Sequence, residues 1–169
     1  MSDNGNLSPS TLIGISCDSI MENLRQMFHE HPNADYRILM LLPDSDAVVR
    51  QVAFEMGYGF EQKITDVRQI HTVADAVTAT NLRIKSAVAL LKNTQAFRDQ
   101  HLQIKYYNEF TPWWIYCVDM NKIYVGILEK GTRGSESAAI LMKKNEKALT
   151  TFDAFEHHWQ RLWEEATPI

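Results

Sequence analysis

Hydrophobic residues recur with two different periods along the chain, and the period indicates where strands and helices lie. Continuous apolar or β-branched runs predict strands at 12–17, 36–42, 102–106, 113–118, 123–128 and 138–142. Apolar residues at helical spacing predict helices at 20–28, 47–56 and 64–97, and a closing helix that starts at Thr150 or Thr151. The segment 64–97 forms either one long helix or two helices with a break near 78–81.

The order of these elements predicts the fold class. The first strand, helix and strand form a βαβ unit, for which a right-handed crossover is expected. The complete order, β-α-β-α-α-β-β-β-β-α, supplies helices for both sides of a sheet, so we expect an α/β fold with a mixed sheet and helices on both faces. Residues 1–10 are polar and rich in turn formers, which predicts a disordered tail. The remaining 11–169 predict a single domain, because no repeat or internal linker interrupts them.

The stretch 105–128 is the most informative part of the sequence. Its two runs at 113–118 and 123–128 are joined by turn-forming residues at 119–122, which predicts a β-hairpin. Pro112 cannot donate a ladder hydrogen bond, so it marks the start of its strand. Gly126 lies inside the second strand, where a glycine indicates a bulge or a close approach of another group.

The spacing within this hairpin resembles the catalytic motif of the phospholipase D-like superfamily, His-x-Lys-x4-Asp-x6-Gly-Ser-x-Asn. Counted from Asp119, the glycine position holds Gly126 and matches, whereas the histidine and lysine positions hold Pro112 and Trp114. The serine and asparagine positions hold Ile127 and Glu129. In that family the histidine attacks phosphorus and the lysine stabilises charge on the phosphate oxygens. Proline offers no nucleophile and tryptophan offers no cation.

The resemblance therefore implies a single phospholipase D-like domain without the family's chemistry, similar to noncatalytic domains of prokaryotic transcriptional regulators. It predicts a ligand-sensing or regulatory domain that acts through a partner or through self-association, and not an enzyme. Two alternatives stay open. One is a phosphodiesterase or nuclease with relocated catalytic residues, and the other is a plain protein-interaction subunit.

Candidate ligand-binding residues cluster around the hairpin and the loop that follows it. Tyr107 and Asn108 close the preceding strand, Trp114 stands at the lysine position, and Asp119 lies in the turn. The glycine- and serine-rich loop 131–137 adds Arg133 and Ser135, and such a loop suits a small anionic ligand. Each residue also has an ordinary alternative role, as a core aromatic, a turn residue or part of a solvated loop.

Composition excludes several other classes. The net charge of −4 argues against direct nucleic-acid binding and against an anionic membrane surface. Cys17 and Cys117 both fall in predicted strands, so we expect reduced core thiols. The histidines are isolated or poorly spaced for a metal, and no motif indicates a cofactor.

Location and assembly follow from the same reasoning. The start of the sequence lacks the features of a signal peptide, and no apolar run could span a membrane, so we expect a cytoplasmic protein. Phospholipase D-like domains with one motif usually pair, and tryptophan and tyrosine are abundant here, so we expect a homodimer, with a regulatory protein as a further candidate partner.

Overall fold

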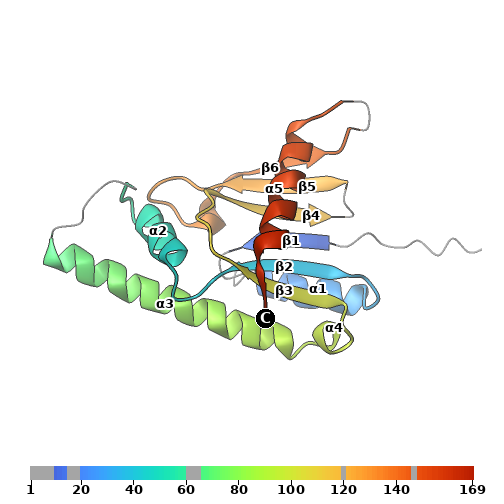
Figure 1. The fold of residues 1–169 in the computed structure, drawn as a ribbon, viewed down its shortest axis with the longest axis horizontal. Coiled ribbons are helices and arrows are strands. Elements are labelled where there is room, and N and C mark those ends of the chain that lie inside the picture. Colours follow the sequence, from blue (N-terminus) through green and yellow to red (C-terminus); the bar gives the residue numbers. More distant parts are fainter. Residues whose placement is uncertain (1–9, 15–19, 60–65, 119–120, 146–147) are drawn as a thin grey trace, which may run out of the picture.

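A computed structural model describes residues 10–14, 20–59, 66–118, 121–145 and 148–169, which form one mixed α/β fold (Figure 1). One seven-stranded sheet runs through it in the order β6-β5-β4-β1-β2-β3-β7. The strands are β1 Ser10–Gly14, β2 Tyr36–Leu41, β3 Leu102–Tyr107, β4 Trp113–Val118, β5 Lys122–Ile127, β6 Ala139–Lys143 and β7 Thr167–Pro168. The helices are α1 Met21–Glu30, α2 Asp46–Glu55, α3 Val67–Lys92, α4 Gln95–Arg98 and α5 Thr151–Glu165, with a 3-10 turn, η2, at Gly134–Glu136.

The sheet has a parallel half and an antiparallel half. Strand β2 pairs in parallel with β1 on one side and with β3 on the other, which confirms the expected βαβ unit. Strands β4, β5 and β6 form an antiparallel meander, and β4 joins it to β1. The predicted mixed sheet is therefore confirmed.

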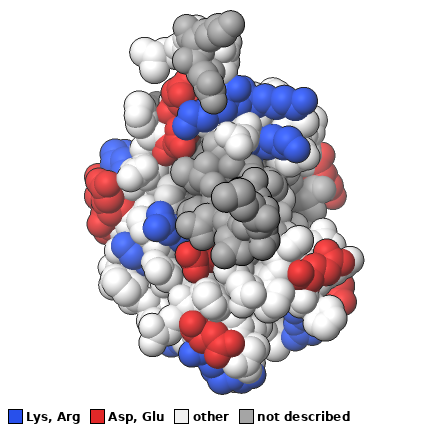
Figure 2. All heavy atoms as spheres, turned by 90° about the vertical axis from the view of Figure 1, so that its right-hand side faces the viewer, with Lys and Arg blue, Asp and Glu red and all other residues white. Residues whose placement is uncertain are grey.

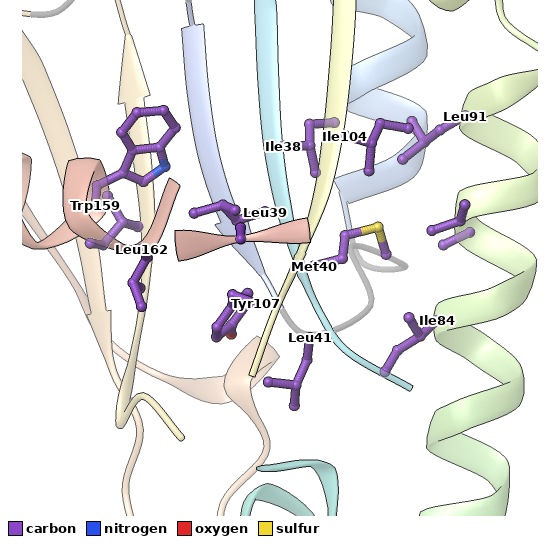
Figure 3. Close-up of a cluster of buried hydrophobic side chains, with 14 of the residues drawn as sticks. Ile38, Leu39, Met40, Leu41, Ile84, Leu91, Ile104, Tyr107, Trp159 and Leu162 are labelled. Atoms are coloured by element: carbon purple, nitrogen blue, oxygen red, sulfur yellow. The ribbon is translucent and has the colours of Figure 1, made fainter. Parts of the chain in front are cut away.

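Strand β2 is buried on both faces, as its continuous apolar run predicts. Leu39 points toward α5, where it lies near Leu162, whereas Ile38 and Met40 point toward α3 (Figure 3). All three side chains are almost fully buried. Helices therefore cover both faces of the sheet, as expected.

Helix α3 is continuous from Val67 to Lys92, so the alternative of a break near 78–81 is wrong. Thr80 and Asn81 are buried within the helix. The side chain of Asn81 accepts a hydrogen bond from the backbone N–H of Asp44 at 2.9 Å, so it does not compete with its own helix backbone. The chain leaves the helix at Asn93, before the short α4.

The closing helix α5 begins where the sequence predicts it. Thr150 and Asp153 form a reciprocal capping box, the arrangement that satisfies free N–H groups at a helix start. Phe152, Trp159 and Leu162 are buried against the sheet. The short strand β7, which pairs with Lys105 and Tyr106 of β3, was not predicted, because two residues carry no periodicity.

Some expectations concern residues outside the described part of the chain. Ser10 belongs to β1, so the strand begins one residue earlier than the expected tail boundary, and the rest of the tail lies outside the described residues. Cys17 lies outside them as well, whereas Cys117 is buried in the core, as expected. Among the described helices, none combines the length and apolar character needed to cross a membrane.

Candidate functional site

The carboxyl ends of the parallel strands lie together at one end of the sheet. We call this end the carboxyl edge, as distinct from the outermost strands of the sheet. The turn with Asp44 follows β2, Asn108 follows β3, and Trp113 begins β4 at the same edge, because β4 runs antiparallel to β1. Helix α2 and the start of α3 lie beside this edge (Figure 1). In open α/β sheets, ligands bind at this edge.

A buried amide fixes the turn after β2. Asp44 adopts a positive φ of 60°, and its backbone N–H is held by the side chain of Asn81. Its carboxylate lies 2.6 Å from the Nζ of Lys85. Aspartate tolerates this left-handed conformation better than most residues. Because Asn81 and Lys85 both belong to α3, this helix holds the turn in a defined shape.

The loop after β5 docks on the end of α2. The carbonyl of Phe54 accepts hydrogen bonds from the N–H groups of Gly57 and Gly131, each at 3.0 Å. Gly57 has a φ of +86° and Gly131 a φ of +85°, a conformation that other residues rarely adopt. The loop that carries Arg133 is therefore held against α2.

Two arginines from separate elements act on one carboxylate at this junction. Burial raises the pKa of Glu55, while a hydrogen bond from Gln51 and the positive charges of Arg83 and Arg133 oppose the rise. Gln51 is itself buried and donates to Glu55 Oε1 at 2.9 Å. Arg83 also donates to Thr80 at 2.9 Å. Glu55 is therefore a half-buried carboxyl group that feels the positive charge of two arginines.

Trp114 fills the position of the motif lysine with a packed ring. It pairs with Gly126 across the hairpin, and a Cβ added at Gly126 would lie 2.0–2.4 Å from three atoms of its indole. The indole Nε1 donates to the carbonyl of Gly134 at 3.1 Å. The strands pair in register through Gly126, so of the two roles expected for this glycine, a close approach is the one observed.

The structure does not gather all the predicted site residues in one place. Tyr107 is buried on the α5 side of the sheet, near Trp159 and Leu162 (Figure 3), and its hydroxyl lies 3.5 Å from Thr111 Oγ1. Trp114 lies on the opposite face. The register across β3, β2, β1 and β4 puts Tyr107 on the same face of the sheet as Leu39 and Ile115, and Trp114 is the neighbour of Ile115 in its strand, so its side chain points to the other face.

The remaining predicted residues are spread along the sheet. Asn108 and Arg133 are exposed at the carboxyl edge. Asp119 lies outside the described residues, and its neighbours Val118 and Asn121 are at the far end of the hairpin. The side chain of Ser135 also lies outside the described part.

Sequence reasoning missed Glu55, the carboxyl group on which both Arg83 and Arg133 act electrostatically. The available signal was a polar pair at helical spacing, Gln51 and Glu55, on the helix 47–56. A second signal was Asn81 inside a long helical pattern. Their convergence depends on how α2 packs against α3, which no local pattern specifies.

The described histidines do not join this cluster. His101 pairs with Asp35 at 3.1 Å at the opposite sheet edge. His158 belongs to α5 and packs against Trp113 of the sheet, and burial lowers its pKa. Within the described ranges, no group of three or more His, Cys, Asp or Glu could hold a metal ion.

Comparison with known proteins gives one structural likeness. The structure matches the crystal structure of a phospholipase D family member, Nuc from Salmonella typhimurium, over 98% of this chain and 84% of that chain. The TM-score is 0.45 and the sequence identity is 14%. No protein-family model and no curated protein matches the sequence. The likeness concerns the overall fold, so function has to be argued from this chain's own residues.

Proposed function

We propose that this protein is a noncatalytic binding domain that takes a small anionic ligand at the carboxyl edge of its parallel strands, through Arg133 and Arg83. The observation that carries the proposal is the effect of both arginines on Glu55. Both guanidinium groups are therefore near enough to one carboxyl group to lower its pKa. A ligand carboxylate or phosphate near that carboxyl group gains charge-assisted hydrogen bonds.

Arg133 is suited to be the first contact. Its side chain is exposed, so its guanidinium is accessible from solvent. The docking of its loop on Phe54 limits the conformations that it must lose on binding. A held loop with an available cation binds an anion at a lower entropic cost than a free loop.

Glu55 gives the site a competitor within the protein. Its negative charge repels an incoming anion while it attracts the same two arginines. Binding therefore requires the ligand to displace Glu55 or Glu55 to become protonated, and its raised pKa brings protonation closer to neutral pH. We expect affinity for a fully ionised anion such as sulfate to increase as the pH falls through the pKa of Glu55.

The hairpin supports the noncatalytic part of the proposal. Pro112 and Trp114 stand where the resembling motif has its nucleophile and its cation, and the Trp114 indole is committed to Gly126 and Gly134. A regulatory output has a direct route, because the loop of Arg133 continues through η2 into β6. A ligand that holds this loop more firmly against α2 therefore also restricts the segment that leads into β6, the outermost strand.

The test compares four proteins against sulfate, phosphate, nucleoside monophosphates and dicarboxylates, by thermal shift and calorimetry. We expect Arg133→Ala to weaken the best ligand by about 1.5–3 kcal/mol, the range for a hydrogen bond to a charged group. Glu55→Gln should strengthen it and remove the pH dependence. Arg50→Ala, which removes an exposed charge from the outer side of α2, is the matched control and should leave affinity unchanged. Equal binding by wild type and Arg133→Ala, or no binding by any of these anions, would overturn the proposal.

A further inference from the structure

One histidine of α5 lies between the helix and the sheet. The ring of His158 is half-buried and meets the ring of Trp113, the first residue of β4, edge to face at 5.3 Å and 73°. Phe155 of the same helix also packs on Trp113, at 5.8 Å. Within the described part of the chain, the buried Nε2 atom of His158 has no hydrogen-bond partner. Packing alone therefore holds this side of the ring.

The other ring nitrogen of His158 faces a guanidinium. Arg161 Nη2 lies 3.4 Å from His158 Nδ1 and 3.0 Å from both carboxylate oxygens of Glu109. A guanidinium can only donate, so Nδ1 accepts and the neutral ring carries its hydrogen on Nε2. Glu109 belongs to the segment 108–112, which links β3 to β4. Neutral His158 thus supports the arginine that ties α5 to this segment.

A proton on His158 is unfavourable in this position. It places a donor on Nδ1 opposite the donor of Arg161, and it leaves a charged ring against an indole with no acceptor at Nε2. Burial and, after it, the positive charge of Arg161 lower the pKa of His158 from its ordinary value of 6.5, while the negative charge of Glu109 opposes this effect. The strand β4 faces the ring with Trp113, which carries no charge.

The wider surface does not outweigh these neighbours. The net charge is −4, and acidic and basic side chains are mixed over most of the face in Figure 2. Charges separated by more than about 10 Å are largely screened at ordinary salt concentrations. The protonation of His158 is therefore set by its own contacts.

We propose that His158 is a proton-sensitive latch between α5 and the segment 108–112. As a neutral ring it packs on Trp113 and accepts from Arg161, which keeps the segment closed on the helix. When it is protonated, the ring turns out to solvent and uncovers Trp113 and the segment. The latch reaches the carboxyl edge through Asn108, and it operates without any ligand there.

The opening is local, because both ends of α5 have attachments of their own. Phe152 is buried near its start, and Lys105 Nζ donates to the carbonyl of Trp163 near its end, at 2.8 Å. The stabilisation that neutral His158 provides is complete above its ordinary pKa of 6.5 and is lost as the pH falls through the lowered pKa.

The experiment follows the full chain by NMR from neutral to acidic pH. The His158 ring reports protonation, and the indole N–H of Trp113, assigned with Trp113→Phe, reports uncovering through its relaxation by a soluble paramagnetic agent. In the wild type we expect the Trp113 N–H to become accessible with the same midpoint as the His158 titration. His158→Gln, which stays neutral and can still accept from Arg161, should remain covered throughout. His157→Gln changes the exposed neighbour on α5, and this matched control should behave as the wild type.

A charge variant tests the direction of the effect. Arg161→Gln removes the cation that opposes protonation, so the midpoint of the His158 ring should move to higher pH. Far-UV circular dichroism checks that each variant is folded, and the wild-type titration tests the latch without any variant. A Trp113 N–H that stays covered while His158 titrates would overturn the proposal. So would an opening that persists in His158→Gln, an opening that is lost in His157→Gln, or a midpoint that Arg161→Gln does not raise.

Discussion

The contact between Trp114 and Gly126 makes a specific prediction about Gly126→Ala. The new methyl group would lie 2.0–2.4 Å from three atoms of the indole. Ordinary contact begins near 3.4 Å, so the ring has to move away by about 1 Å or more. The backbone offers no relief, because Trp114 and Gly126 are directly paired in the ladder.

The magnitude follows from two losses. Displacing the ring breaks the hydrogen bond from Trp114 Nε1 to the carbonyl of Gly134, which contributes about 0.5–1.5 kcal/mol. Forcing a methyl group into an occupied space costs about 1–3 kcal/mol. We therefore expect Gly126→Ala to lower the free energy of unfolding by about 2–4 kcal/mol.

The assay is a double-mutant cycle in urea, followed by far-UV circular dichroism so that the loss of one tryptophan does not change the probe. The four proteins are the wild type, Gly126→Ala, Trp114→Ala and the double mutant. With the indole removed, Gly126→Ala should become neutral or stabilising by about 0.5–1 kcal/mol, the usual cost of glycine within a strand.

The cycle separates this explanation from a general intolerance of side chains at Gly126. If Gly126→Ala costs the same with and without the indole, steric exclusion by Trp114 is refuted. The m-values should stay equal across the four proteins, since a change would indicate that the unfolded or native state had altered in compactness.

Three further predictions concern other parts of the molecule. Generic phosphodiesters and DNA should not be hydrolysed by the purified protein, and turnover that tracks the protein through purification and is lost on changing His71 or His101 would restore the enzyme alternative. Trp159→Ala should lower the free energy of unfolding by about 3–5 kcal/mol, as for other buried large aromatics, because Trp159 is 5% exposed and stacks on Trp163; urea unfolding measures this, and normal stability would contradict the packing. Hydrogen bonds from the backbone and side chain of Thr150 lower the pKa of Asp153 below its ordinary value of 3.8. The ionised Asp153 therefore stabilises the folded protein above that pH, and this stabilisation is lost as the pH falls through the lowered pKa. Asp153→Asn should remove this part of the acid dependence in unfolding curves measured between mildly acidic and strongly acidic pH.

The sequence predicts the features that depend on local patterns. The buried strand β2 and the start of α5 near Thr150 follow from the residues themselves, because they are set by the period of apolar residues and by hydrogen-bonding chemistry. At Gly126 the sequence leaves a bulge and a close approach open, and the structure shows the close approach. The continuity of α3 was ambiguous, since Asn81 favours a break in isolation. Its side chain instead accepts a hydrogen bond from the backbone N–H of Asp44. This contact between distant segments overrides the local preference.

The candidate site could be predicted only in part. Arg133 was found because a cation in a glycine-rich loop is visible in the sequence. The assignment of Tyr107 and Trp114 to one pocket failed to anticipate that they lie on opposite faces, since that depends on strand register across β1 and β2. Arg83 and Arg133 come near Glu55 only because α2, α3 and the loop after β5 pack together, and such packing leaves no short-range pattern in a sequence.

The pairing of β1 with β4 has a consequence for how the chain folds. It is the ladder that joins the parallel strands to the antiparallel meander, and it matches only Thr11–Ile13 with Ile115–Cys117. The meander of β4, β5 and β6 is built from neighbouring segments, whereas this seam, like the ladder between β2 and β3, joins segments that lie far apart in the chain and is entropically slow to close. Helix α5 crosses the seam, with contacts to β6 and to β3 (Figure 1). The meander can thus form as a unit of its own, and the docking of α5 ties it to the parallel strands.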